Sequence, residues 1–137
     1  MRVEAVPKSV GAITLFIDGV ERAKEFYGRA FEASAIYEDE NSVVFGFENM
    51  VVNLLRVGEA PGLIGPAAVA SREAGSRFQL TIWVEDTDAA CAALAERGVE
   101  LLNGPVDRAW GMRTASFADP DGHIWEVAAQ IADGSQG

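Results

Sequence analysis

Two reactive side chains are almost absent from this sequence. Its 137 residues include one cysteine, Cys91, and one histidine, His123. A lone cysteine cannot form an internal disulfide bond, so a reducing compartment fits this chain. A single histidine is poor material for a Ser-His-Asp triad or other histidine-dependent acid–base chemistry. There is also no phosphate-binding loop and no Gly-x-Gly-x-x-Gly dinucleotide fingerprint.

Positive charge is scarce as well. The chain has 11 Lys and Arg against 21 Asp and Glu, which gives a net charge of −10 at pH 7. This balance opposes binding to nucleic acids and to anionic membranes, and no basic cluster offsets it. We attribute the acidic balance to solubility rather than to function.

Long apolar runs are missing too. No segment is long enough to span a bilayer, and the first ten residues, MRVEAVPKSV, contain no apolar signal core. We therefore expect no membrane association and a cytoplasmic location. The hydrophobic content of 49% is that of one globular domain with a buried core.

The predicted elements occur in the same order twice. Residues 12–17 predict a strand, and a helix follows over 20–29, because its apolar residues recur on one face: Val20, Ala23, Phe26, Tyr27 and Ala30. Three further strands are predicted at 34–37, 42–47 and 50–57. The second copy has a strand at 78–84, a helix at 87–97 and a strand at 99–102, and a hairpin within 112–130 supplies two more strands.

The repeat predicts the fold class. The segment FIDGVERAKEFY at 16–27 aligns with WVEDTDAACAAL at 83–94, an offset of 67 positions. We expect one α+β domain over 1–137, with a first module at about 11–57, a linker at 58–77 and a second module at about 78–131. The eight strands would form a cup-shaped curved sheet with one helix outside each half. The Gly- and Pro-rich stretch 58–75 is either a lid or a tolerated insertion.

A strong turn signal precedes the last strand. Asp119-Pro120-Asp121-Gly122 predicts a tight turn between two apolar strands. By alternation, Ile124, Glu126 and Ala128 share one face of the last strand, while Trp125 lies on the other and should pack under a helix. Glu126 is either a polar anchor in a pocket or a carboxylate on an exposed strand.

Three segments resemble the vicinal-oxygen-chelate superfamily. They are ITLFIDGVERAKEFY, LTIWVEDTDAACAALAERGVEL and WGMRTASFADPDGHIWEVAAQ. That group contains glyoxalase I, the bleomycin- and mitomycin-binding resistance proteins and the extradiol dioxygenases. The resemblance covers about residues 11–130, and its most specific part is the Asp-Pro-Asp-Gly turn followed by Glu126. It implies paired βαβββ modules around a buried pocket, usually in a homodimer.

The resemblance also places four positions that bind a metal ion in the metal-dependent members. They fall on Ala12, Asn53, Gln79 and Glu126. Alanine has no donor atom, amides are weak ligands for transition metals, and only Glu126 is a strong ligand type. We therefore expect no functional metal, with at most a weakly held divalent cation at Glu126. If Glu126 is buried without a metal, we expect Gln79 or Asn53 to hydrogen-bond it.

Several other side chains are candidate pocket residues. Thr14 and Thr81 alternate onto the faces of Ala12 and Gln79, and so should line the cup. For Asn53 and Gln79, the alternative to ligand contact is ordinary polarity at a strand end or edge. Trp83 shares the face of Thr81.

Aromatic and cationic residues complete the predicted pocket. Trp110 resembles an aromatic residue at the cup mouth of antibiotic-binding members; for Trp83 and Trp110 the alternative is a place in the core. Phe45 and Phe47 can continue the aromatic lining, although we favour the core for both. Arg113 either meets an anionic ligand group or pairs with Asp107 or Glu126.

Three functions remain open at this stage. The first is a metal-free, dimeric binding protein of the resistance type that sequesters a drug or an aromatic metabolite. The second is a lyase or isomerase that uses Glu126 as base or as a weak metal ligand. The third is a dimeric interaction module whose cup is filled by side chains.

Overall fold

The first module is a βαβββ unit. The computed structural model describes residues 5–131, so the first four residues of the N-terminal decapeptide lie outside it. Strand β1 (Ala12–Ile17) leads into helix α1 (Val20–Phe31), and β2 (Ala35–Glu38), β3 (Ser42–Gly46) and β4 (Val51–Arg56) follow. These strands form a sheet in the order β1-β4-β3-β2, which we call sheet A; its β1–β4 pair is parallel. All five apolar helix residues predicted to face the core are buried.

The second module repeats this unit. Strand β5 (Gln79–Trp83), helix α3 (Thr87–Glu96), β6 (Leu101–Asp107), β7 (Met112–Ala118) and β8 (Ile124–Gln130) form sheet B, in the order β5-β8-β7-β6. Helix α3 is capped by Asp86, whose side chain accepts a hydrogen bond from the Ala89 amide at 3.0 Å. The predicted α+β fold of two βαβββ modules is confirmed, but the strands form two four-stranded sheets rather than one continuous sheet.

The linker is less irregular than its composition suggests. It contains a 3-10 turn η1 (Val57–Glu59), the one-turn helix α2 (Pro61–Ile64) and a second 3-10 turn η2 (Arg72–Ala74). Proline at the first position of α2 suits a helix start, since its missing N–H has no partner there in any case. None of the helices among residues 5–131 is long and apolar enough to cross a membrane.

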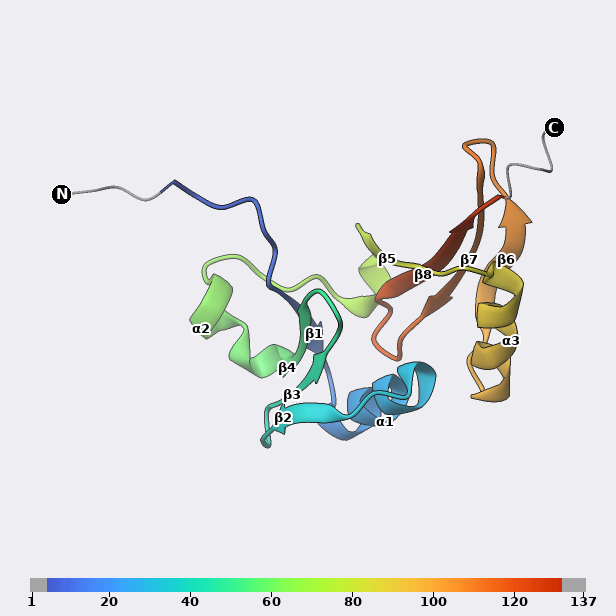
Figure 1. Cartoon of the computed structure of the whole chain (residues 1–137). Helices are drawn as coiled ribbons and strands as arrows, with labels where there is room; N and C mark the ends of the chain where they lie inside the picture. The colour runs from blue at the N-terminus through green and yellow to red at the C-terminus, as the bar shows by residue number, and fades with distance from the viewer. Residues whose placement is uncertain (1–4, 132–137) are drawn as a thin grey trace.

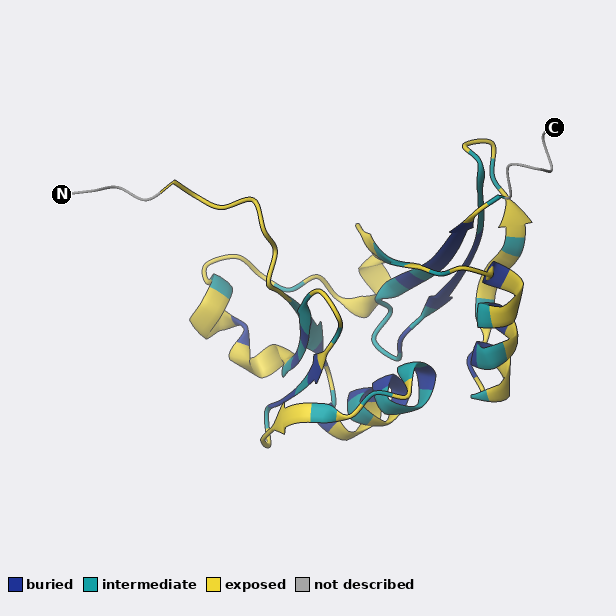
Figure 2. Cartoon of the chain, in the orientation of Figure 1, coloured by how far each residue is buried: buried dark blue, intermediate teal, exposed yellow. Residues whose placement is uncertain are grey.

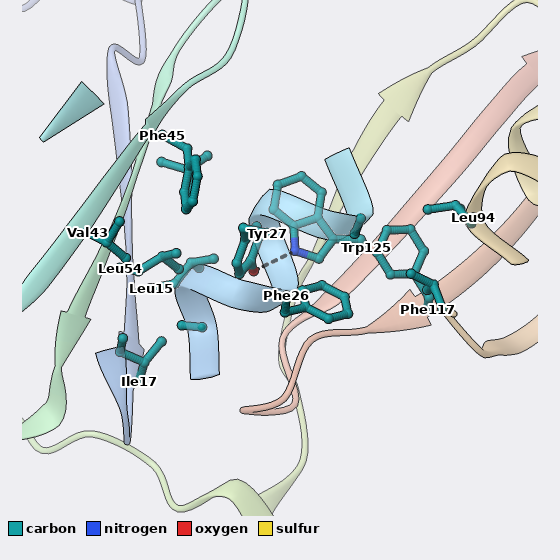
Figure 3. Packing of buried hydrophobic residues seen from close by; sticks show 14 of the residues in the cluster. Leu15, Ile17, Phe26, Tyr27, Val43, Phe45, Leu54, Leu94, Phe117 and Trp125 are labelled. Carbon is teal, nitrogen blue, oxygen red and sulfur yellow. Dashed lines mark hydrogen bonds between the residues drawn. The ribbon is translucent and has the colours of Figure 1, made fainter. Parts of the chain in front are cut away.

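Helix α1 joins the two modules. In Figure 1 it lies below the gap between the two sheets, and Figure 3 shows Tyr27 and Phe26 between the side chains of sheet A and those of sheet B. The Tyr27 ring lies 6.0 Å from Phe45 and 5.9 Å from Trp125, so one aromatic cluster spans both modules. Trp125 therefore packs under a helix, as alternation predicted.

This packing decides which sheet faces remain open. The residues that alternate toward the helices form one core, coloured dark blue on the central strands in Figure 2. The opposite faces, which carry Thr14 and Asn53 on sheet A and Thr81 and Glu126 on sheet B, are covered by neither α1 nor α3. We call these the open faces; within one chain they do not close into a cup.

Candidate functional site on the open faces

Glu126 has a hydrogen-bond partner on the neighbouring strand. Thr81 lies directly opposite it in the parallel β5–β8 pair, and Thr81 Oγ1 donates to Glu126 Oε1 at 2.8 Å. Glu126 is half-buried, so this bond holds its carboxylate in one orientation while an edge stays accessible. Our expectation of Gln79 or Asn53 as the partner is wrong. A period of two shows that Thr81 shares a face with Gln79, but the strand register decides which of them meets Glu126.

Asn53 occupies the equivalent place on sheet A. It lies opposite Thr14 in the parallel β1–β4 pair, and Asn53 Nδ2 donates to Thr14 Oγ1 over 3.4 Å, at the long limit of a hydrogen bond. Each module therefore has a threonine on its first strand beside a polar residue on its last strand. The two pairs differ in charge, because asparagine replaces glutamate in module one.

The remaining two metal positions contribute little. Ala12 and Gln79 begin the first strands of the two modules, and both are exposed. One carboxylate, two amides and a methyl group do not fit a transition metal, which requires several imidazole, thiolate or carboxylate donors. Among residues 5–131, no three His, Cys, Asp or Glu side chains gather as a metal site. Our expectation of no functional metal remains a prediction.

Two tryptophans are exposed near this surface. Trp83 ends β5 on the same face as Thr81 and is 74% exposed, and Trp110 lies in the β6–β7 hairpin and is 71% exposed. The core alternative for these tryptophans is therefore wrong. Exposed aromatic rings can serve as the wall of a ligand site.

Arg113 does not point toward Glu126. It pairs with Asp107 at 2.9 Å and with Asp88 of α3 at 3.2 Å, on the helix-covered side of β7. Its hydrogen bond to Asp107 is the first cause of a raised Arg113 pKa. The alternative that pairs it with Asp107 is therefore correct.

A different arginine reaches the open face of sheet B. Arg108 Nε donates to Thr114 Oγ1 at 2.9 Å, and Thr114 shares the alternating face of Glu126. Its Nη2 donates to Asn103 at 3.0 Å. Sequence analysis missed this residue, because Arg108 lies in the hairpin, where alternation assigns no face.

Phe45 and Phe47 belong to the core between the modules. Phe45 is 1% exposed beside Tyr27, and the Phe47 ring stacks on Trp125 at 5.6 Å. The alternative that we favoured for both residues is confirmed, and neither lines an open face.

The turn before β8 joins the modules through polar contacts. Buried Asp119 accepts hydrogen bonds from the amides of Asp121 and His123 and from Tyr27 Oη, the last at 2.6 Å. His123 Nε2 lies 2.8 Å from the Phe16 carbonyl oxygen, so the single histidine of the chain also links the two modules. The Tyr27 and Asp-Pro-Asp-Gly segments already carried the resemblance, but only the structure joins them.

Comparison with known proteins identifies relatives of this arrangement. The family model "Glyoxalase/Bleomycin resistance protein/Dioxygenase superfamily" matches residues 9–127. The uncharacterized protein YraH of Bacillus subtilis is 29% identical over 119 residues, covering 84% of this chain and 93% of YraH.

Solved structures of related proteins have a similar fold. A glyoxalase-related enzyme from Fulvimarina pelagi is 27% identical, with a TM-score of 0.79 over 90% of this chain and 89% of that one. A glyoxalase/bleomycin resistance protein/dioxygenase from Nocardioides is 22% identical, with a TM-score of 0.84 over 98% and 91%, and this likeness concerns the fold alone.

Proposed function

The chain belongs to the glyoxalase/bleomycin resistance protein/dioxygenase superfamily, and we propose that it binds a small organic molecule without using a metal. The ligand would be a drug or an aromatic metabolite that is sequestered, as in the resistance type. The observation that carries this proposal is the Glu126–Thr81 pair on an uncovered sheet face that ends in the exposed Trp83. A fixed carboxylate beside an aromatic ring suits a planar ligand with a donor or cationic group.

The open faces support a homodimer. A single sheet face is too shallow to bury a ligand, whereas small-molecule sites usually bury most of the ligand surface. We propose that a second copy covers the open faces and completes the pocket, so that sheet A of one chain meets sheet B of the other. Asn53 with Thr14, and Glu126 with Thr81, would then line the same space. Arg108 gives this space one cationic group.

Fluorescence titration tests the binding function. Trp83 and Trp110 are exposed while Trp125 is buried, so a ligand on the open face should quench the first two and leave Trp125 emitting. Bleomycin and mitomycin C serve as first probes, followed by a panel of planar aromatic cations. Any ligand found should bind at least about tenfold more weakly to Trp83→Ala or Glu126→Gln, the loss expected when a stacked ring or a charged hydrogen bond is removed.

Trp110→Ala and Arg113→Gln sharpen this test. Trp110→Ala should weaken the same ligand, and an unchanged affinity would overturn the stacking role of that ring. Arg113→Gln is the matched control, because its guanidinium already pairs with Asp88 and Asp107 away from Glu126. A cup filled by side chains predicts instead that no small molecule quenches these tryptophans.

The alternative is a lyase or isomerase in which Glu126 acts as a general base. Its support is the orientation of the Glu126 carboxylate by Thr81, which leaves one oxygen for proton transfer. Purified protein is assayed with the adduct of methylglyoxal and glutathione, with and without added Ni²⁺, Zn²⁺ or Mg²⁺. Thioester formation that Glu126→Gln abolishes would favour the enzyme, and its absence in every metal condition would remove the glyoxalase version.

A further inference from the structure

A cavity lies at the junction of the two modules, apart from the Glu126–Thr81 pair. Its volume is about 480 Å³, which falls in the range of small-molecule sites. It is bounded by the end of β1, by the linker between β4 and β5, and by the turn before β8. None of the four positions matched to the family's metal ligands lines it.

The floor of this cavity is held by bonds between the modules. The amide of Asp18, just after β1, donates to Asp121 Oδ1 at 2.9 Å, and His123 Nε2 contacts the Phe16 carbonyl at 2.8 Å. Arg22 of α1 lies 3.7 Å from the same Asp121 oxygen. The floor is therefore a preorganised part of the fold, although Asp18 and Asp121 are 103 positions apart in the sequence.

The walls are largely apolar. Phe16 contributes from β1, Phe78 precedes β5, and Ile64 and Val69 come from the linker. The Phe78 ring is tilted at 44° to the His123 ring, with centroids 6.2 Å apart. Aromatic and aliphatic walls of this kind favour a ligand with an apolar, planar body.

Two arginines of the cavity lack ion-pair partners. Arg72 and Arg77 line the cavity and are exposed, and among residues 5–131 neither lies within 4.0 Å of a carboxylate oxygen. A guanidinium group binds a carboxylate through two parallel hydrogen bonds. The arginines therefore make this side of the cavity complementary to an anion.

The floor of the cavity is acidic and disfavours an anion. The Asp121 side chain is only 5% exposed, and its Oδ2 atom has no hydrogen-bond partner among the described residues. Together with Asp18, it repels an anion from the floor and favours a hydrogen-bond donor there. A ligand must then place its carboxylate at the arginines and a donor toward Asp121.

We propose that this cavity binds a small aromatic acid that carries a hydrogen-bond donor on its ring. The carboxylate pairs with Arg72 and Arg77, and the ring lies between Phe16 and Phe78. The donor approaches the Asp121 carboxylate, which lines the cavity. No bond is made or broken, and the site is independent of Glu126.

Three matched probes test the proposal by ¹H–¹⁵N NMR titration of the full chain. They are 3-(4-hydroxyphenyl)propanoate, its neutral amide, and 3-phenylpropanoate, which lacks the ring donor. The hydroxylated acid should shift amide signals in the linker and in residues 121–123. The amide should bind about tenfold more weakly, because it loses the charge-assisted pairing, and 3-phenylpropanoate should bind several-fold more weakly.

The variants locate the binding site. Arg72→Gln with Arg77→Gln should reduce the affinity for both acids to that of the amide, whereas Arg56→Gln, which removes an exposed arginine outside the cavity lining, should change nothing. Glu126→Gln should leave this binding intact, which separates it from the proposed open-face function. Equal affinity for acid and amide, unchanged binding by the double variant, or signal shifts confined to the open faces would overturn the proposal.

Discussion

At the scale of single residues, the buried polar contacts sit between the modules. Tyr27 Oη donates to Asp119 Oδ2 at 2.6 Å and accepts from Trp125 Nε1 at 2.9 Å, the bond drawn as a dashed line in Figure 3. Burial raises the pKa of the Tyr27 hydroxyl far above its usual range, so it remains a donor at any ordinary pH. These hydrogen bonds therefore fix the orientation of the Tyr27 and Trp125 rings within the core.

Tyr27→Phe should destabilise the fold although it removes only one hydroxyl group. The substitution leaves the Asp119 oxygen and the Trp125 N–H without this shared partner inside the core. We expect the free energy of unfolding to fall by about 1–3 kcal/mol in urea denaturation. Tyr37→Phe is the control, because Tyr37 is exposed and bonds only Asp39, and it should cost less than about 0.5 kcal/mol. Equal effects of the two variants would contradict a role for the network.

Asp121 predicts a pH dependence of stability. Burial is the first cause that raises its pKa above 3.8, so the folded state binds a proton more readily than the unfolded state. Its contribution to stability is then greatest below the unfolded pKa and is lost as the pH rises through the folded pKa. Relative to wild type, Asp121→Asn should gain stability as the pH rises above 3.8.

Asp39 supplies a control of opposite sign when the free energy of unfolding is measured as a function of pH. Hydrogen bonds, the Asn41 amide first, lower the Asp39 pKa. Asp39→Asn should therefore lose stability relative to wild type as the pH rises toward 3.8, below the range in which Asp121 acts. Parallel pH profiles for the two variants would contradict the assignment for Asp121.

At the scale of elements, strand β6 departs most from the prediction. We expected a strand over 99–102, but β6 runs from Leu101 to Asp107 and continues through Asn103-Gly104-Pro105. Its pairing with β7 shifts register around this point, so the glycine and proline sit in a bulge rather than at an end. Glycine and proline occur both in turns that end a strand and in bulges inside a strand, so the sequence alone does not distinguish the two. The pairing of β6 with β7 does.

Gly104→Ala tests this bulge. Gly104 has a φ of +91°, and an added Cβ would lie 2.4 Å from the Thr114 carbonyl oxygen. Gly111 has a nearly equal φ of +89° with nothing within 4 Å of such a Cβ. We expect Gly111→Ala to cost about 1–2 kcal/mol from backbone strain alone, and Gly104→Ala to cost a further ~1–3 kcal/mol from the close approach. Thermal or urea unfolding that ranks the two variants equally would contradict the tight contact.

At the scale of the whole molecule, the helices join the modules and leave the sheets open. Arg97 Nη1 donates to the Ala30 carbonyl at 2.9 Å, and Arg97 Nη2 pairs with Glu32 at 2.9 Å. Arg29 in turn donates to the Arg97 carbonyl, so the C-terminal ends of α1 and α3 hold one another. The modules are fixed through their helix-covered sides, which leaves the open faces uncovered for the second copy that we propose.

Sedimentation equilibrium tests the homodimer. We expect wild-type protein to have about twice the mass of one 14.6 kDa chain at micromolar concentration. Val44→Glu adds a charge to the open face of sheet A, beside Asn53, and should shift the protein toward monomer. Ala92→Glu adds the same charge to an exposed position of α3 and should leave the mass unchanged. A wild-type monomer would remove the shared pocket from the proposed function.

The sequence alone determined the modules and most of their faces. Periods of 3.6 and 2 predicted helix α1 with its buried residues, strand β1, and the side of Glu126 opposite Trp125, because these patterns depend on neighbouring residues only. The tertiary structure decided what depends on residues far apart in the chain. Register chose Thr81 as the partner of Glu126, and module docking placed Phe45 in the core and left Trp83 exposed. Contacts between residues about 100 positions apart leave no periodic pattern in the local sequence. Any strand with the same alternation could pair in the same way, so the sequence pattern alone does not identify the partner.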